Sequence, residues 1–229
     1  MRLDALLSRY GYCSRREAPG WIKRHSITFK GEPCSAPTDK VQAEGILLDG
    51  EPVEFPDGLY AALYKPAGYT CSHDDGEGGV IYDLLPFQWR HRNPAVSSVG
   101  RLDKETSGLL LITDDGKFIH RMTSPRHHVA KVYEAVTEED IPEAVELFAS
   151  GTFTLNGEDR PCAPAVLEIL EPRRARLTLT EGKYHQVRRM LAAVGAPVAS
   201  LCRISIGSLH LDSLNLEPGE WMPIRPDAL

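Results

Sequence analysis

An aspartate set between two cations is the first candidate for chemistry in this sequence. In the stretch 99–113, VGRLDKETSGLLLIT, Asp103 lies between Arg101 and Lys104. Such a carboxylate can form an ordinary surface ion pair, or it can be kept ionised and aimed at a substrate as a nucleophile. The apolar run Leu109–Ile112 predicts a strand that is covered on both faces. Because loops beside buried strands often carry catalytic groups, Asp103 is a candidate catalytic residue.

A charged segment late in the chain supplies arginines that can meet this carboxylate. The segment 181–191, EGKYHQVRRML, opens a predicted helix whose apolar residues recur at helical spacing. Arg188 flanks the apolar face and is expected to reach inward, whereas Arg189 points further out. A partly buried arginine needs an anionic partner, and Asp103 can be that partner.

Positive charge is concentrated in two places although the net charge of the chain is -6. Residues 1–30 contain seven Lys or Arg and two acidic residues, whereas residues 31–60 contain one Lys and seven acidic residues. Each cluster alone can be a solvated face, but two basic clusters in an acidic protein favour a nucleic-acid partner. The second cluster comprises Arg173, Arg174, Arg176, Lys183, Arg188, Arg189 and Arg203.

Composition argues against several classes of protein. The five cysteines are widely spaced and form no C-x-x-C pair, so neither a disulfide framework nor a zinc ribbon is predicted. Apolar runs fall short of the roughly 20 residues that span a bilayer, and the charged first residues do not suit a signal peptide, so we expect a cytoplasmic protein without membrane partners. His73 and the pair His127-His128 lack the spacing of zinc sites, which disfavours a metal-dependent hydrolase. Nucleophile-elbow and dinucleotide motifs are missing as well, and we expect neither a metal nor a cofactor.

The beginning of the chain predicts a small unit of helices and a hairpin. Apolar residues in the range 3–10 follow helical spacing, and Ser14–Glu17 has the spacing of a capping box that should begin a second helix. Pro19 would fall inside that helix, where we expect a kink or a break. A strand is expected at 26–29, and a strand, an Asp-Gly turn and a second strand at 46–53.

The remainder of the chain predicts a larger α+β unit. Pro56-Asp57-Gly58 is a short polar turn, so we place the boundary there and predict an N-terminal domain at 1–57 and a second domain at 58–229. Short strands alternate with helical patterns, which indicates a large mixed, mainly antiparallel sheet flanked by helices. The expected strands are 60–64, 95–99, 108–113, 129–136, 166–170 and 175–179, and the expected helices are 117–122, 141–150 and 184–194.

Taken in order, these motifs resemble the RsuA branch of the pseudouridine synthases over nearly the whole chain. The resemblance implies that Asp103 is the essential aspartate, Tyr133 the active-site tyrosine that stacks on uracil, and Arg188 the basic partner of the aspartate. The segments that carry it in the second domain are Lys65-Pro66-Ala67-Gly68-Tyr69, Gly100–Leu109, Lys131-Val132-Tyr133 and His185–Met190.

Residues 1–55 resemble a small RNA-binding domain of the S-four type, through Arg2-Leu3-Asp4 and Ser14-Arg15-Arg16. The resemblance implies that this unit grips structured RNA mainly through backbone charge and shape. Candidate residues for substrate or RNA binding along the chain are Arg2, Arg15, Arg16, Lys23, Arg24, Lys65, Arg101, Lys183, Arg189 and Arg203.

The resemblance implies an isomerase that converts one uridine of ribosomal RNA to pseudouridine without a cofactor. Segment Thr123–His128 is similar to the branch that modifies small-subunit RNA, so we expect a small-subunit target, most specifically uridine 516 of 16S rRNA. The substrate can be free RNA or an assembly intermediate, and nothing in the sequence requires more than a monomer. The alternatives are a large-subunit synthase of the same family and a non-catalytic RNA-binding or ribosome-assembly protein.

Overall fold

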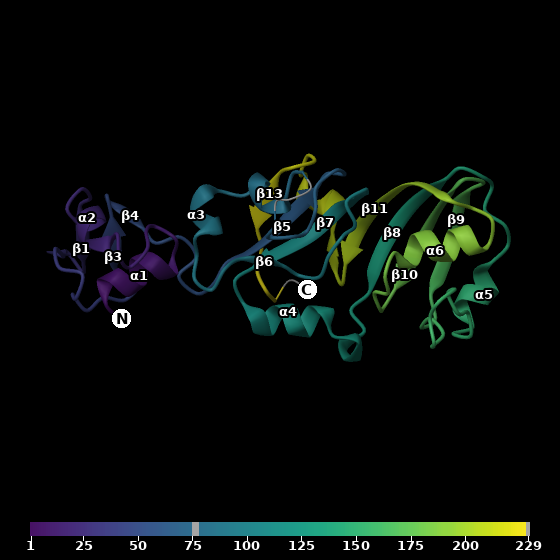
Figure 1. Cartoon of the computed structure of the whole chain (residues 1–229), viewed down its shortest axis with the longest axis horizontal. Coiled ribbons are helices and arrows are strands. Elements are labelled where there is room, and N and C mark those ends of the chain that lie inside the picture. The colour runs from purple at the N-terminus through teal and green to yellow at the C-terminus, as the bar shows by residue number, and fades with distance from the viewer. Residues whose placement is uncertain (75–77, 228–229) are drawn as a thin grey trace.

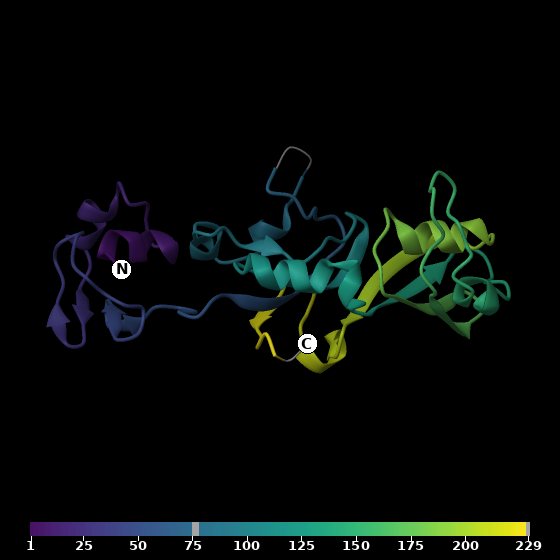
Figure 2. The same ribbon diagram turned by 90° about the horizontal axis from the view of Figure 1, so that it is seen from below.

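The computed structural model describes residues 1–74 and 78–227 and is elongated, with a small N-terminal unit at one end (Figures 1 and 2). This unit contains two short helices and a four-stranded sheet in the order β2-β1-β3-β4. Its own hydrophobic core includes Leu3, Leu6 and Leu7, which are fully buried, as the helical spacing predicts. The elements are α1 (Leu3–Arg9), α2 (Ala18–Ile22), β1 (Ile27–Phe29), β2 (Glu32–Pro33), β3 (Ile46–Leu48) and β4 (Glu51–Pro52).

The second helix begins later than the sequence pattern predicts. The capping box forms, with the Ser14 amide donating to Glu17 Oε2 at 3.0 Å and the Glu17 amide to Ser14 Oγ at 3.3 Å. The α-helix itself starts at Ala18, so Pro19 occupies its first turn. A proline is tolerated there because the first amides of a helix have no intrahelical acceptor. The predicted kink at Pro19 is therefore wrong.

In the described residues, the larger sheet has nine strands. Seven of them follow the order β13-β5-β7-β11-β8-β10-β9, while β12 pairs with β11 and β6 pairs with β7. Neighbouring strands run antiparallel except β7 and β11, which are parallel. The predicted mixed, mainly antiparallel sheet is confirmed. The strands are β5 (Tyr60–Lys65), β6 (Ser97–Ser98), β7 (Thr106–Thr113), β8 (Lys131–Thr137), β9 (Val166–Glu171), β10 (Arg174–Leu179), β11 (Val198–Ile206), β12 (Leu209–His210) and β13 (Trp221–Pro223).

Short helices flank this sheet. Within residues 1–74 and 78–227, no helix has the length and apolar character needed to cross a membrane. The helices are α3 (Phe87–Arg90), α4 (Gly116–Thr123), α5 (Val145–Ala149) and α6 (Gln186–Ala193), and the 3-10 turns are η1 (Ile81–Leu84), η2 (Pro125–His127) and η3 (Leu211–Leu214).

Strand β7 is buried on both faces, as its continuous apolar run predicts. On one face Leu109 and Leu111 pack with Phe118 of α4. On the other face Leu110 and Ile112 join the core that lies under η1 and α3. The strand is therefore a rigid support for the loop that precedes it.

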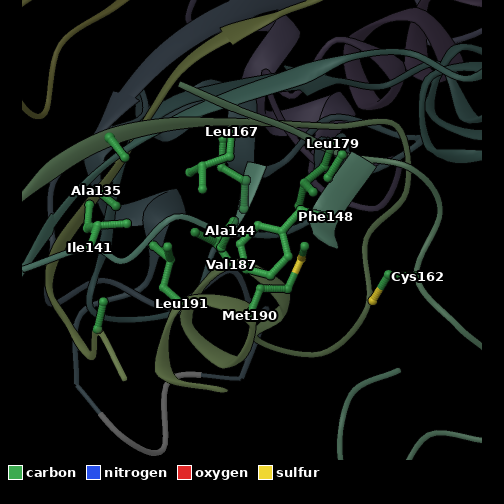
Figure 3. Packing of buried hydrophobic residues seen from close by; sticks show 14 of the residues in the cluster. Ala135, Ile141, Ala144, Phe148, Cys162, Leu167, Leu179, Val187, Met190 and Leu191 are labelled. Carbon is green, nitrogen blue, oxygen red and sulfur yellow. The ribbon is translucent and has the colours of Figure 1, made fainter. Parts of the chain in front are cut away.

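The half of the sheet formed by β8, β10 and β9 is covered by α5 and α6 (Figure 3). Phe148 of α5 and Met190 of α6 are almost fully buried there, against Leu167 of β9. This packing fixes the start of α6 over the end of β10.

Close approach of β7 and β11 depends on Gly108. The register pairs Gly108 with Arg203, and Gly108 has a φ of +113°. A Cβ at this position would lie 2.3 Å from the Arg203 carbonyl oxygen, so a larger residue does not fit. The glycine thus brings Arg203 next to the strand that follows Asp103.

Candidate active site

A cavity of about 400 Å³ lies where β7, β8 and β11 meet the loop before α6. Its size falls within the range of small-molecule sites. Asp103 and Tyr133 both line it, and so do three residues predicted to bind substrate or RNA, namely Arg101, Lys183 and Arg203. Residues that are widely separated in the sequence are thus brought around one space.

The side-chain partner of Asp103 is a histidine. Its Oδ1 lies 3.3 Å from Nε2 of His185, and about a third of the Asp103 side chain remains exposed. His185 precedes α6 in the left-handed conformation, with φ +48°. This backbone turn belongs to the segment that lines the cavity, and it places the imidazole beside Asp103.

The predicted ion pair between Asp103 and Arg188 is not present in the described part of the chain. The Arg188 guanidinium donates instead to the carbonyl oxygens of Val198, at 3.2 Å, and Glu105, at 3.0 Å. These two backbone acceptors lie at the starts of the central strands β11 and β7, so Arg188 reaches the loop of Asp103 without touching the carboxylate. Arg188 holds the backbone around the candidate nucleophile.

Lys65 holds the same loop from inside the protein. Its ammonium donates to the carbonyl oxygens of Thr106 at 2.7 Å, and of Asp103 and Lys104 at 3.2 Å each. The side chain is fully buried, so the prediction that Lys65 binds RNA is wrong. Burial lowers the pKa of the ammonium, whereas Asp103 and Glu105 are among the nearby groups that raise it. The ammonium is thus a buried cation bound to the backbone of the loop that carries Asp103.

Arg203 is the third cation of the site and borders the cavity directly. It is 3% exposed, and its Nε donates to the Leu109 carbonyl at 2.8 Å. Its Nη1 lies 3.5 Å from the Tyr133 hydroxyl, and its guanidinium lies 5.9 Å from the centre of that ring. Arg203 therefore orients Tyr133 at the cavity.

Two buried polar atoms in residues that line the cavity have no hydrogen-bond partner in the described structure. They are Nη2 of Arg203 and Oγ1 of Thr106. Buried donors and acceptors are normally satisfied, so unpaired ones at a cavity indicate a place for polar ligand atoms. Beside them, Lys131 also lines the cavity, and burial together with the charge of Arg203 lowers its pKa.

The other predicted binding residues lie at or beyond the edge of the cavity. Arg101 is exposed on its wall. Lys183 and Arg189 both pair with Glu158, at 3.5 and 2.9 Å, and Arg189 does not contribute to the lining.

The predicted RNA-binding residues of the N-terminal unit lie away from the cavity. Arg2 and Arg15 share the carboxylate of Asp4, at 2.9 and 3.6 Å. The remaining three are exposed, and no carboxylate in the described part of the chain lies within ion-pair distance of them; they are Arg16, Lys23 and Arg24.

Sequence reasoning missed several residues of the site. His185, Tyr184 and Thr106 all fall inside or beside the motifs quoted above, but their types alone did not single them out. His185 meets Asp103 across the fold, and such a contact has no signature in a single sequence. In residues 1–74 and 78–227 no group of His, Cys, Asp or Glu side chains could hold a metal ion.

Comparisons with known proteins identify the family of the chain. Residues 59–193 match the model of the family described as RNA pseudouridylate synthase. The chain is 38% identical over its whole length to the ribosomal small subunit pseudouridine synthase A of Pasteurella multocida and 39% identical to that of Escherichia coli K12, covering 98% of each. A solved pseudouridylate synthase structure shares the fold with a TM-score of 0.67 and 35% identity, over 99% of this chain and 97% of the other. The chain therefore belongs to the RNA pseudouridylate synthase family, as an RsuA-like isomerase.

Proposed function

We propose that the chain isomerises a single uridine of small-subunit ribosomal RNA to pseudouridine. The names of its relatives in Pasteurella multocida and Escherichia coli support the small-subunit target. The finer proposal is uridine 516 of 16S rRNA. The observation that carries the proposal is the cavity in which Asp103, Tyr133 and Arg203 face the same space.

The reaction rearranges bonds within one nucleotide. The bond between uracil nitrogen 1 and the anomeric carbon of the ribose breaks, the base turns, and a bond forms between carbon 5 and the same anomeric carbon. Carbon 5 then loses its proton and nitrogen 1 gains one, so product and substrate have the same atoms. The balance needs a nucleophile or charge partner, a proton carrier and a space in which the base can turn.

Asp103 is the proposed nucleophile or charge partner, acting on the anomeric carbon or on the base. Lys65 and Arg188 bind the backbone around it, so its carboxylate keeps a direct side-chain contact with His185 and a partly exposed surface for substrate. Positioned charge of this kind lowers the barrier without reorganisation.

Tyr133 and Arg203 are proposed to hold the uracil. The Tyr133 ring offers a stacking surface and its hydroxyl is a candidate for the proton that leaves carbon 5. The unpaired Nη2 of Arg203 is a donor suited to a uracil carbonyl, which would satisfy it on binding.

The exposed cations Arg16, Lys23 and Arg24 of the N-terminal unit are proposed to bind the RNA backbone. The substrate can be free RNA or an assembly intermediate, and we propose that the enzyme acts as a cytoplasmic monomer.

The proposal is tested by mapping pseudouridines with carbodiimide and reverse transcription. Small- and large-subunit RNA, free and as assembly intermediates, are treated with wild-type protein or with Asp103→Asn, which keeps the shape of the side chain but not its charge. We expect one new small-subunit site with the wild type and none with the variant. A large-subunit site would correct the substrate, and tight binding with no new site would favour a non-catalytic RNA-binding protein.

A further inference from the structure

A large exposed aromatic side chain lies at the entrance of the active-site cavity. Tyr184 is 71% exposed although it belongs to the lining. The catalytic steps proposed above make no use of it. An aromatic ring at a cavity that receives RNA is a potential stacking surface for a base, because every base has a π face.

The backbone that carries Tyr184 is firmly held. Its carbonyl accepts from Arg189 Nη1 at 3.1 Å. Next to it, the Lys183 amide donates to Gln186 Oε1 at 2.8 Å, and Gln186 Nε2 donates to Glu181 at 2.7 Å. Little backbone freedom remains to be lost when a ligand binds, which favours affinity.

One face of the Tyr184 ring is already occupied by a neighbour. The ring stacks on the His185 imidazole with centroids 3.9 Å apart and planes 16° from parallel. The same imidazole contacts Asp103 at 3.3 Å. His185 thus links the two residues, with one face of its ring toward Tyr184 and its Nε2 toward Asp103, and the other face of the Tyr184 ring is left for a further base.

We propose that Tyr184 is a stacking platform for a nucleotide that flanks the target uridine. When the target leaves its stack, the neighbouring base loses a stacking partner, which costs free energy. The outer face of Tyr184 offers that base a new partner at the rim of the cavity. Stacking there would hold the RNA open and fix which side of the target faces the protein. The inference rests on the proposed function.

The test places the fluorescent base 2-aminopurine next to the target uridine, on either side in turn, in an RNA fragment that the wild type modifies. Binding by wild type or by Tyr184→Phe should quench the probe at one of the two positions. Tyr184→Ala and Tyr184→Leu should lose that quenching and raise KM about tenfold, in keeping with the usual contribution of one base stacked on an aromatic side chain. Because Tyr184→Leu keeps apolar bulk, a loss of quenching in this variant is due to the missing aromatic ring.

Phe87→Ala is the matched control, since Phe87 is also highly exposed, at 74%, but does not line the cavity. It should leave quenching and KM unchanged. Unaltered quenching and KM in Tyr184→Ala would overturn the inference. Failure of the wild type to form pseudouridine in any ribosomal RNA would instead count against the proposed function. The mapping of pseudouridines and the quenching measurement are separate experiments, so the two failures can be told apart.

Discussion

Asp103 is held chiefly through its backbone rather than through its carboxylate. The carbonyl oxygens of residues 103–106 all accept hydrogen bonds from Lys65 or Arg188. Cations placed in this way hold the loop through its carbonyl groups and leave the carboxylate oxygens of Asp103 for His185 and substrate. A direct ion pair with an arginine would satisfy the same oxygens that the reaction needs.

Replacing Lys65 with Met tests this support of the loop. Met keeps the apolar stem but removes the buried ammonium. The carbonyls of Asp103 and Lys104 keep the backbone donors Thr106 N and Gly68 N, whereas that of Thr106 loses its 2.7 Å bond. We expect the free energy of unfolding to fall by about 2–4 kcal/mol in urea titrations. We also expect kcat to fall at least tenfold while the Kd for RNA changes little.

Lys117→Met is the control for Lys65→Met, because Lys117 is exposed on α4. Its stability and kcat should stay within error of the wild type. A Lys65→Met variant with normal stability and weakened RNA binding would support the sequence-based prediction that this lysine binds RNA.

At the scale of elements, sequence patterns located the segments with simple periodicity. Strand β7 and helix α4 were predicted within two residues of their observed bounds, since one has a continuous apolar run and the other a clear apolar stripe. Strand β11 was missed. Its pairing with β8 shifts register at Val198/Ser200 and at Arg203/Ser205, and each shift breaks the alternation that identifies a strand.

The missed strand also explains the limits of the site prediction. Motif residues such as Asp103 and Tyr133 were identified through resemblance, and the structure does place both at the cavity. The role of Arg203 depends on its position in β11 opposite Gly108, and that of Lys65 on its complete burial. A basic residue type in a sequence is read as surface charge, so burial of these two could not be predicted.

Helix α4 is anchored at its start by a single carboxylate, that of Asp115. Its Oδ1 accepts from the amides of Lys117 at 2.8 Å and Phe118 at 3.2 Å, and its Oδ2 accepts from the Tyr60 hydroxyl at 2.9 Å. Burial, the largest single influence on the Asp115 pKa, raises it, but these hydrogen bonds together lower it below its usual value. Burial, together with the same contact to Asp115, raises the pKa of Tyr60 to about 12. Asp115 thus links β5 to α4.

Asp115→Ala should lower the free energy of unfolding by about 1–2 kcal/mol at pH 7, the usual cost of losing an N-cap. The folded-state pKa of Asp115 is depressed, so its contribution is present above the ordinary pKa of 3.8 and is lost as the pH falls through the lower folded value. Urea unfolding at pH 7 and below pH 3 measures this, and the gap between variant and wild type should narrow in acid. The control Asp159→Ala, in an exposed loop, should unfold with the same free energy as the wild type at both pH values. If the destabilisation by Asp115→Ala were equally large at both pH values, the role assigned to the ionised Asp115 carboxylate would be contradicted.

At the scale of the whole molecule, the N-terminal unit is joined to the rest by more than the connecting chain. The buried guanidinium of Arg92 pairs with Asp114 at 2.9 Å, donates to the Glu54 and Phe55 carbonyls at 3.2 Å each, and lies 5.1 Å from the centre of the Tyr10 ring. The Gln88 side chain and the Asn93 amide add hydrogen bonds to α1 and its C-cap. These contacts tie the N-terminal unit to α3 and to the end of β7, the strand whose preceding loop carries Asp103.

The two basic clusters of the sequence have different electrostatic situations in the fold. In the late cluster Arg173 pairs with Asp140, and Arg174 and Arg176 pair with Glu134. In the part of the chain that the structure describes, Arg16, Lys23 and Arg24 have no carboxylate within ion-pair distance. Exposed unpaired cations release more counterions from RNA than paired ones do, so the N-terminal cluster should dominate the salt dependence of binding.

Replacing Arg16, Lys23 and Arg24 together with Gln tests this division. Each phosphate contact contributes about 0.7 to 0.9 to the slope of log K against log salt, so the slope should become shallower by about 2. Measurements of Kd between roughly 50 and 200 mM KCl give the slope. The comparison set, Arg173, Arg174 and Arg176 replaced with Gln, removes the same charge but from ion-paired positions, and should change the slope by less than about 1. Circular dichroism melting of both variants checks that they are folded. If the comparison set had the larger effect, RNA would bind across β10 rather than along the N-terminal unit, and the small domain would serve another purpose than anchoring the substrate.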